Sequence, residues 1–242
     1  MREQTFSDGE LMRAFEDAGI GLASLERLTR GACAVNFKAV RRSDGMKFVI
    51  RCCPPRMSRD LVDRLISTLE RLKGTKAAQL VLPEAPAGLN EYRIVCLSWC
   101  DGEPVFPDRL SDGEFRTFLD DYLEFSKALG GRIHGDFQPY NVHFANGRIS
   151  GIFDLDEVCD GVPAQDVIRY FSCAYWHLKF VQFVRRRRTL VRFADAVRYL
   201  PWSPDEWQEG LRALRERYTA YKSSRSLRRL KPFEKIIREL FE

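Results

Sequence analysis

The chain has 242 residues, of which 45% are hydrophobic and 30% charged, and its formal net charge is +5. A chain of this length can bury a large core and usually forms one or two domains. The longest apolar run, near residues 176–184, is interrupted by His, Lys and Gln, which excludes a membrane span. The lack of a cleavable signal pattern, and seven cysteines without metal-ligand spacing, predict a cytoplasmic protein with reduced thiols.

The first hundred residues are expected to form a small antiparallel sheet. Residues 24–30 and 36–42 have the pattern of strands on either side of a small-residue turn, where a nucleotide phosphate could approach the backbone at Gly31. A hairpin turn leads into a third predicted strand, residues 46–52, in which apolar and polar side chains alternate.

A helix and two more strands are predicted next. Ser58 can cap the helix, and leucines at helical spacing form an apolar stripe that ends at Gly74. Residues 79–82 and 92–98 then have the pattern of strands, and they lead to the segment 99–104.

The second half of the chain is predicted to be mainly helical. A capping-box pattern at residues 111–114 opens a long helix, which two glycines close at residues 130–131. The same pattern at residues 7–10 and 203–206 predicts the start of two other helices. We interpret the aromatic side chains of the long helix as core residues without a cofactor role.

The most informative segment follows the long helix. His134 and Asp136 are two residues apart and Asn141 follows Asp136 by five, which are the spacings of the catalytic loop of protein kinases. A predicted strand, turn and strand over residues 142–153 then carries Asp154 back beside Asn141. Each polar residue alone could be an ordinary turn residue, but four at matched spacing favour a phosphoryl-transfer site.

Phosphoryl transfer requires these residue types. Its transition state spreads negative charge over the phosphoryl oxygens, so the protein mainly supplies positioning and cations. We interpret Asp136 as the base for an attacking hydroxyl, since its carboxylate is the only basic group in the loop besides His134. Asn141 and Asp154 are candidate ligands of Mg²⁺, which prefers oxygen donors.

Two short sequences also carry a family resemblance. His-Gly-Asp at residues 134–136 and Phe-Asp-Leu-Asp at residues 153–156 resemble the aminoglycoside phosphotransferase and choline kinase branch of the protein-kinase-like fold. The resemblance is specific over residues 133–170, where Gly161 and Asp166 look like the family's glycine and helix-starting aspartate.

The resemblance implies a bilobal protein-kinase-like fold of the α+β class, with a small antiparallel-sheet N-lobe and a mainly helical C-lobe. Residues 1–98 would form the nucleotide-binding lobe, and residues 99–242 the catalytic and acceptor-binding lobe. The implied activity is that of a small-molecule kinase that uses ATP and Mg²⁺.

Within the nucleotide-binding lobe, the resemblance places Arg51 where the family has a phosphate-pairing lysine, with Lys47 as an outside candidate. Glu70 would hold Arg51 in place, or would be a surface residue that pairs along its own helix; Asp63 is a weaker competitor. Adenine would lie against the backbone of the segment that contains Leu97, Trp99 and Cys100.

Basic residues are concentrated near the C-terminus, where residues 176–242 hold 17 Lys and Arg against 8 Asp and Glu. The arginine run 185–188 would attract anions, unless it forms a solvated helix face. If the run is functional, the acceptor is an anionic molecule, such as a phosphorylated sugar, a lipopolysaccharide core or a lipid headgroup at a membrane surface. In this respect the chain also resembles lipopolysaccharide-core sugar kinases of the same superfamily.

Two other classes of function stay open. A pseudokinase scaffold or regulatory binding protein without turnover would explain Arg51 and the sparse glycine turn, whereas Asp136, Asn141 and Asp154 favour an enzyme. Nucleic-acid binding is not expected, because basic and aromatic residues are not interleaved and no RNA-binding motif is present. The sequence names neither the acceptor nor the oligomeric state.

Overall fold

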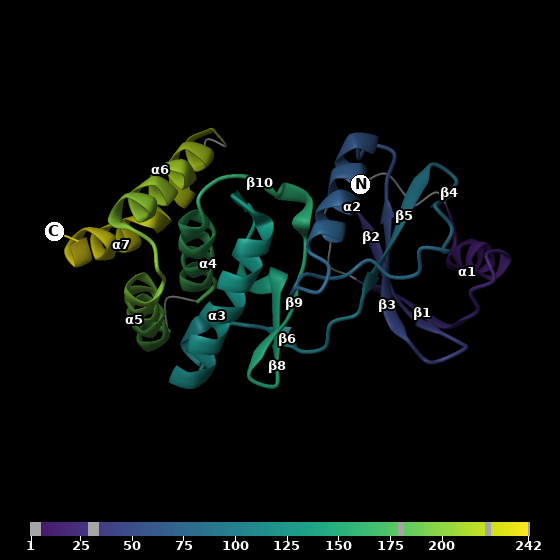
Figure 1. The fold of residues 1–242 in the computed structure, drawn as a ribbon, viewed down its shortest axis with the longest axis horizontal. Coiled ribbons are helices and arrows are strands. Elements are labelled where there is room, and N and C mark those ends of the chain that lie inside the picture. Colours follow the sequence, from purple (N-terminus) through teal and green to yellow (C-terminus); the bar gives the residue numbers. More distant parts are fainter. Residues whose placement is uncertain (1–5, 29–33, 179–181, 221–223, 242) are drawn as a thin grey trace. The chain divides into compact units, whose positions relative to one another are not determined.

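The computed structural model describes residues 6–28, 34–178, 182–220 and 224–241. The chain divides into two compact units, the N-terminal unit of residues 1–100 and the C-terminal unit of residues 101–242. The N-terminal unit is built on an antiparallel sheet and the C-terminal unit is mostly helical (Figure 1). The protein therefore has an α+β fold, as predicted from the sequence.

Five strands form the sheet of the N-terminal unit in the order β1-β2-β3-β5-β4, and each neighbouring pair is antiparallel. Their bounds are Leu22–Leu28 for β1, Val35–Arg41 for β2, Lys47–Cys53 for β3, Gly88–Leu89 for β4 and Tyr92–Ser98 for β5. The four long strands confirm the predictions to within two residues. Antiparallel pairing of short neighbouring segments explains why local sequence patterns were sufficient here.

The predicted strand at residues 79–82 is wrong. This segment makes two backbone hydrogen bonds with β5, Val81 to Cys96 and Ser98 to Gln79, but it is not a strand and has one isolated bridge, between Leu80 and Leu97. Two features prevent a full strand: Leu82 has a left-handed backbone with φ of 54°, and the side chain of Gln79 turns back to bond the loop that follows the preceding helix. A left-handed residue interrupts the extended geometry that a ladder requires.

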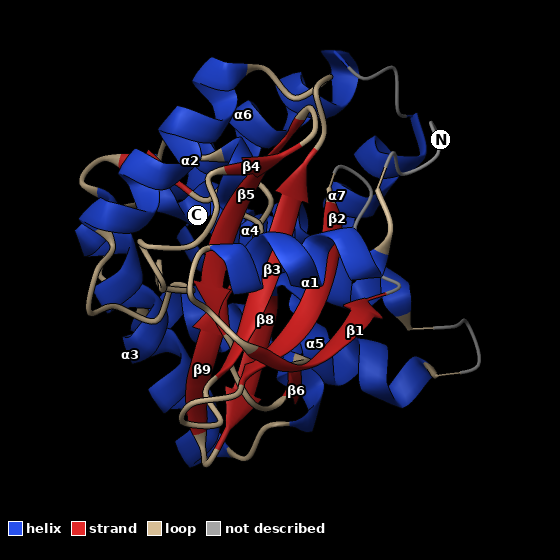
Figure 2. Cartoon of the chain, turned by 90° about the vertical axis from the view of Figure 1, so that its right-hand side faces the viewer, coloured by secondary structure: helices blue, strands red, loops and turns tan. Residues whose placement is uncertain are grey.

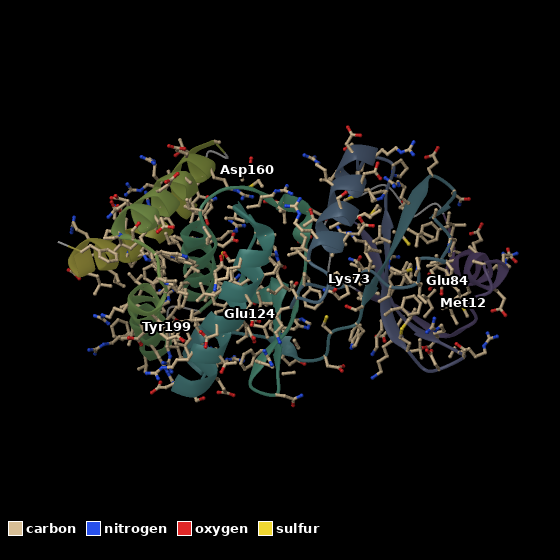
Figure 3. The ribbon with its side chains drawn as sticks, viewed as in Figure 1. Met12, Lys73, Glu84, Glu124, Asp160 and Tyr199 are labelled. Carbon is tan, nitrogen blue, oxygen red and sulfur yellow. The ribbon has the colours of Figure 1, made fainter. Side chains whose placement is uncertain are left out.

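Two helices, α1 (Asp8–Asp17) and α2 (Arg59–Arg71), cover opposite faces of the sheet (Figures 1 and 2). Leu11 and Phe15 of α1 are buried in the core on one face, and Met12, labelled in Figure 3, packs against the same core. Val62 of α2 packs with Cys53 of β3 on the other face. Because side chains alternate along a strand, Arg51 shares the α2 face with Cys53.

Five helices dominate the C-terminal unit: α3 (Asp112–Leu129), α4 (Pro163–His177), α5 (Phe183–Tyr199), α6 (Pro204–Ala220) and α7 (Ser224–Phe241). Its short strands form two small sheets. One joins β6 (Glu103–Pro104), β8 (Val142–Ala145) and β9 (Arg148–Ile152), and the other joins β7 (Arg132–Ile133) and β10 (Cys159–Asp160). No helix in the described part of the chain is long and apolar enough to cross a membrane.

The capping predictions are confirmed. Ser111 and Glu114 form a capping box at the start of α3, and Gly130 ends the helix in the left-handed conformation with φ of 62°. Ser7 forms the same box in α1, and Ser203 bonds Glu206 at the start of α6. These caps satisfy backbone N–H groups that the first turn of a helix leaves without partners.

Aromatic side chains fill the core of the C-terminal unit, as interpreted from the sequence. Tyr122 of α3 lies 4.7 Å from the Phe137 ring, measured between ring centroids. The hydroxyl of Tyr170 donates to the carbonyl of Val105 at 2.7 Å, which satisfies a buried polar group. At the surface, the exposed Tyr199 at the end of α5, labelled in Figure 3, donates to Asp120 of α3 at 2.8 Å, which ties these two helices together.

The hairpin of β8 and β9 matches the predicted strand, turn and strand. Its turn residues Asn146 and Gly147 both have positive φ, at 51° and 76°. This is the geometry of the tight turn that joins antiparallel strands most directly. The pairing of Val142 with Ile152 brings the two ends of the hairpin together.

Candidate active site

The loop that contains the His-Gly-Asp sequence lies between β7 and a short helical turn, Pro139–Asn141. Gly135 has φ of 78°, and a Cβ atom built on it would lie 2.2 Å from the carbonyl oxygen of Glu157. A side chain at this position would therefore both strain the backbone and collide with the carbonyl of Glu157, in the short helical turn that precedes β10. The loop can approach residue 157 this closely only because residue 135 is glycine.

The side chain of His134 is buried and bonded at both ring nitrogens, so it joins two segments rather than acting as a free base. Its Nε2 donates to the carbonyl of Phe153 at 2.7 Å, and its Nδ1 accepts from the backbone N–H of Asp136 at 3.2 Å. Burial lowers the pKa of His134, although the nearby Asp166 opposes this effect. The neutral imidazole thus connects the loop at Asp136 to the residue that precedes Asp154.

Asp166 holds the loop from the first turn of α4. Its carboxylate accepts the backbone N–H groups of His134 and Gly135, at 2.7 and 3.0 Å. Burial raises the pKa of Asp166, while His134 and the two N–H donors work in the opposite direction. The helix-starting aspartate that the family resemblance indicated therefore positions the His-Gly-Asp loop.

Asp136 accepts hydrogen bonds from three side chains. Arg169 donates to Oδ1 through Nε, at 2.9 Å, and through Nη2. Gln138 donates to Oδ2 at 2.9 Å and Asn141 donates to Oδ2 at 3.2 Å. The side chain of Asp136 is 14% exposed, so a largely buried carboxylate is held in one orientation.

Asn141 and Asp154 come together at the open end of the β8–β9 hairpin. The backbone N–H of Phe153 donates to the carbonyl of Asn141 at 2.9 Å, which places Asp154 one residue from that bond. Asp154 is exposed and has a left-handed backbone with φ of 60°, which aspartate tolerates better than most residues. The predicted proximity of these two residues is therefore present in the backbone.

The donor types at this point fit Mg²⁺. The carboxylate of Asp154 and the amide oxygen of Asn141 are hard oxygen ligands, and magnesium in kinases is held by one or two such ligands together with phosphate oxygens and water. In the described parts of the chain, no group of three or more His, Cys, Asp and Glu side chains forms a complete metal cage.

Two arginines at the loop were not found from the sequence. Arg169 of α4 pairs with Asp136, and Arg217 of α6 donates to the carbonyl of Gly135 at 2.6 Å and pairs with Glu157. One signal was available for Arg169, which lies three residues after Asp166 and so on the same face of the helix. For Arg217 the sequence offers no signal, since 82 positions separate it from Gly135.

The nucleotide-binding candidates belong to the N-terminal unit. Arg51 is buried on β3, where its backbone lies opposite Val95 of β5 in the sheet. Lys47, at the start of the same strand, is exposed, as expected of a solvated edge. Glu70 is exposed in the last turn of α2, which agrees better with the surface alternative, and Asp63 pairs with Arg93.

The proposed adenine segment lies at the end of β5. Leu97 pairs with Val49 of β3, and Trp99 and Cys100 follow the strand, all three half-buried. The Lys38 ammonium lies 4.7 Å from the centroid of the Trp99 ring. Gly31 lies outside the described residues.

The arginine run on α5 is largely engaged within the fold. Arg185 pairs with Asp108, whose side chain is 1% exposed. Arg186 donates two hydrogen bonds to the carbonyl of Leu178, the residue that follows α4. Arg188 donates to the carbonyl of Leu110. Arg187 is exposed. The run therefore resembles structural contacts more than a surface that collects anions.

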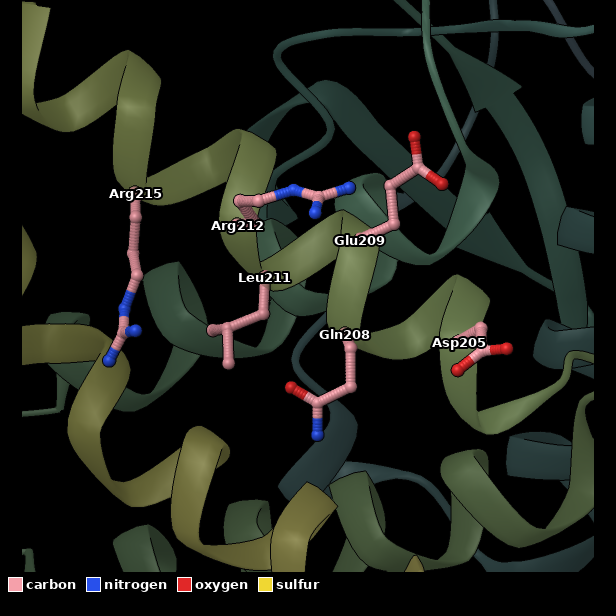
Figure 4. Close-up of a pocket in the computed structure, with 6 residues that line it drawn as sticks. All are labelled: Asp205, Gln208, Glu209, Leu211, Arg212 and Arg215. Atoms are coloured by element: carbon pink, nitrogen blue, oxygen red, sulfur yellow. The ribbon is translucent and has the colours of Figure 1, made fainter.

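A surface hollow on α6 is lined by the residues Asp205, Gln208, Glu209, Leu211, Arg212 and Arg215 (Figure 4). All of them come from one helix, and none belongs to the Asp136 loop or to the hairpin. Its acidic and basic side chains are mixed, and Arg215 pairs with Glu234 of α7. We therefore assign the chemistry to the loop and the hairpin rather than to this hollow.

The fold and the loop define a phosphotransferase of the protein-kinase-like class. The family model described as "Phosphotransferase enzyme family" matches residues 54–233, which is most of the chain. The chain therefore belongs to this phosphotransferase family, as the resemblance indicated. No curated protein sequence matches the chain.

Two solved structures share the fold. An apo form of a thermostable mutant of aminoglycoside phosphotransferase APH(4)-Ia has 13% identity and a TM-score of 0.55, and the match covers 96% of this chain and 99% of that one. A second thermostable mutant of that enzyme, in a ternary complex with ADP and hygromycin B, has 12% identity and a TM-score of 0.50, and the match covers 93% and 96%. At this identity the likeness is one of fold.

Proposed function

We propose that the chain transfers the γ-phosphate of ATP to a hydroxyl of a small molecule, with Mg²⁺ as the metal. The observation that carries the proposal is the arrangement of Asp136, Asn141 and Asp154, which the His134 bridge and the hairpin hold in one place. One carboxylate for the acceptor hydroxyl and two oxygen donors for the metal are the protein groups that in-line phosphoryl transfer requires.

In this mechanism the roles divide between the loop and the hairpin. Asp136 accepts a hydrogen bond from the acceptor hydroxyl and takes its proton as the hydroxyl oxygen attacks the γ-phosphorus. The bond from the γ-phosphorus to the βγ-bridging oxygen breaks, and ADP leaves. Asn141 and Asp154 would hold Mg²⁺, which when bound neutralises charge on the phosphates.

We assign nucleotide binding to residues 1–98 and catalysis with acceptor binding to residues 99–242. In the first of these lobes Arg51 is the proposed phosphate partner, because guanidinium can bind phosphate through two parallel hydrogen bonds. The adenine would lie against the segment of Leu97, Trp99 and Cys100. ADP in the complex of APH(4)-Ia supports the use of an adenine nucleotide by this fold.

The acceptor is proposed only as a hydroxyl compound. APH(4)-Ia was crystallised with hygromycin B, a small molecule, which supports a small acceptor. The basic C-terminal region was the reason to expect an anionic sugar, a glycolipid or a membrane surface. Because most of the run 185–188 contacts groups within the fold, it gives that expectation no support, and the proposal carries no charge preference.

A scaffold without turnover is the second candidate, and one observation favours it. The carboxylate of Asp136 is already held in an ion pair with Arg169, so the group that would bind an acceptor hydroxyl is occupied. The Asn141 and Asp154 pair would then serve nucleotide binding alone.

Turnover separates the two candidates. Thermal unfolding should be measured with ATP and Mg²⁺ together and separately, and ADP formation should be followed with amino alcohols, sugars, aminoglycosides and lipopolysaccharide fragments as acceptors. The enzyme reading predicts acceptor-dependent ADP formation that falls by about 10²- to 10⁴-fold in Asp136→Asn with Mg-ATP binding kept. Stabilisation by Mg-ATP without turnover on any acceptor would favour the scaffold.

A further inference from the structure

The carboxylate of Asp136 has no room for an additional donor. Arg169 supplies two N–H groups to Oδ1, and Gln138 and Asn141 supply one each to Oδ2. An ionised carboxylate offers about four lone-pair positions in all. An acceptor hydroxyl can therefore donate to Asp136 only if one of these groups moves away.

Arg169 and Asn141 are the costly groups to move. The pair of Arg169 and Asp136 is charge-assisted and its side chains are 16% and 14% exposed, so separation would leave two poorly solvated charges. The same Nδ2 of Asn141 that donates to Oδ2 also donates to the backbone carbonyl of Asp136 at 2.9 Å. This second bond holds the Asn141 amide in place.

Gln138 is the group that can leave at least cost. Its uncharged amide makes one hydrogen bond to Oδ2, at 2.9 Å, and its side chain is half-buried rather than enclosed. Its backbone is extended, with φ of −149° and ψ of 160°, between the buried residues Phe137 and Pro139. The backbone is thus fixed while the long side chain can change rotamer.

We propose that the amide of Gln138 occupies the position of the acceptor hydroxyl on Oδ2 of Asp136, and that it keeps water from the base until an acceptor displaces it. This inference rests on the proposed function. When the amide is absent, water donates to Oδ2 and its oxygen bonds to the γ-phosphorus of ATP. The bond to the βγ-bridging oxygen breaks, the water proton passes to Asp136, and the products are ADP and phosphate.

The test is hydrolysis of Mg-ATP without any acceptor. Gln138→Ala should raise the rate about 10- to 100-fold, the equivalent of one hydrogen bond to a charged group, with the KM for ATP unchanged. Gln138→Glu keeps the length of the side chain but cannot donate when ionised, so it should raise the rate as well. Gln208→Ala, an exposed glutamine on α6, is the matched control and should behave as wild type.

A double variant with Asp136→Asn and Gln138→Ala tests whether the gain runs through the base. The gain should disappear in this variant. Hydrolysis that does not rise in either single variant, in proteins that bind Mg-ATP as wild type does, would overturn the role of Gln138 and leave the proposed function standing. A gain that survives in the double variant would also overturn it. Wild-type protein that binds no Mg-ATP would remove the proposed function itself.

Discussion

The guanidinium of Arg169 donates to Oδ1 of Asp136 at 2.9 Å across 33 positions of sequence. Burial acts to lower the pKa of Arg169, but the charge of Asp136, the nearby Cys173 and Tyr218 and the hydrogen bond to Asp136 together outweigh it, and the pKa is raised. The guanidinium therefore stays charged, and α4 fixes the orientation of the carboxylate on the loop. Arg169 is a positioning residue for Asp136.

Replacing Arg169 should lower both the free energy of unfolding and the turnover rate. A double-mutant cycle of Arg169→Gln and Asp136→Asn, followed by chemical denaturation, should give a coupling energy of about 0.5–3 kcal/mol, the range for contacting charged groups. Arg169→Lys should recover part of the turnover lost in Arg169→Gln, because it restores the charge without the fork. A coupling energy near zero would mean that solvent screens the pair.

Removing the proposed metal ligands should separate nucleotide binding from metal dependence. Asp154→Ala should abolish the extra thermal stabilisation that Mg²⁺ adds to ATP, and Asn141→Ala should reduce it, since phosphate oxygens alone do not complete the coordination. Asp160→Ala, at an exposed position in the same unit, is the control. If all three variants keep the wild-type response to Mg-ATP, the metal site lies elsewhere.

Gly135 and Gly147 have nearly equal φ, but only at Gly135 would a side chain collide with a neighbouring group. Comparing alanine variants at the two positions therefore separates the cost of backbone strain from the cost of the collision. Gly147→Ala places a side chain at φ of 76° in open space and should cost about 1–2 kcal/mol, the usual penalty of the left-handed region. Gly135→Ala has φ of 78° and adds the collision with Glu157, so it should destabilise the protein clearly more. Denaturation midpoints of the two variants give the comparison, and equal losses would show that the loop moves freely.

The arginine run offers a second matched pair. Arg185→Gln leaves the buried Asp108 without its charged partner. It should lower the free energy of unfolding by about 1–3 kcal/mol. Arg187→Gln changes an exposed residue two positions further along the helix, and it should change the free energy of unfolding by no more than about 0.5 kcal/mol. Similar denaturation curves for the two variants would restore the view of the run as a solvated face.

Local patterns carried most of the prediction from sequence. Capping boxes, the β8–β9 hairpin and the spacing of Asp136 and Asn141 depend on residues only a few positions apart, and all are present in the structure. The failed strand at residues 79–82 had suitable composition but ends at Leu82, whose left-handed backbone no local pattern announced. A leucine is an unusual residue for that conformation.

Long-range pairing explains what the sequence did not reveal. Arg169 and Arg217 reach the loop from helices 33 and 82 positions away. Only the helical spacing of Arg169 from Asp166 gave a signal for the first, and no spacing rule connects the second with the loop. Long-range pairing also determines the contacts of the arginine run, for which the sequence left open an anion-attracting surface or a solvated helix face. Arg185 looks like a surface charge until α5 packs next to Asp108, 77 positions earlier in the chain.

The imidazole of His134 touches both halves of the candidate site, since one nitrogen bonds the Phe153 carbonyl and the other accepts from the Asp136 amide. A shift of the hairpin end at Phe153 would therefore change the hydrogen bonds of the His134 ring. The chain contains three histidines, so the ring nitrogens of His134 would give nuclear magnetic resonance signals in an uncrowded spectrum. Those signals would therefore report the binding of a ligand near Asp136 or Asp154.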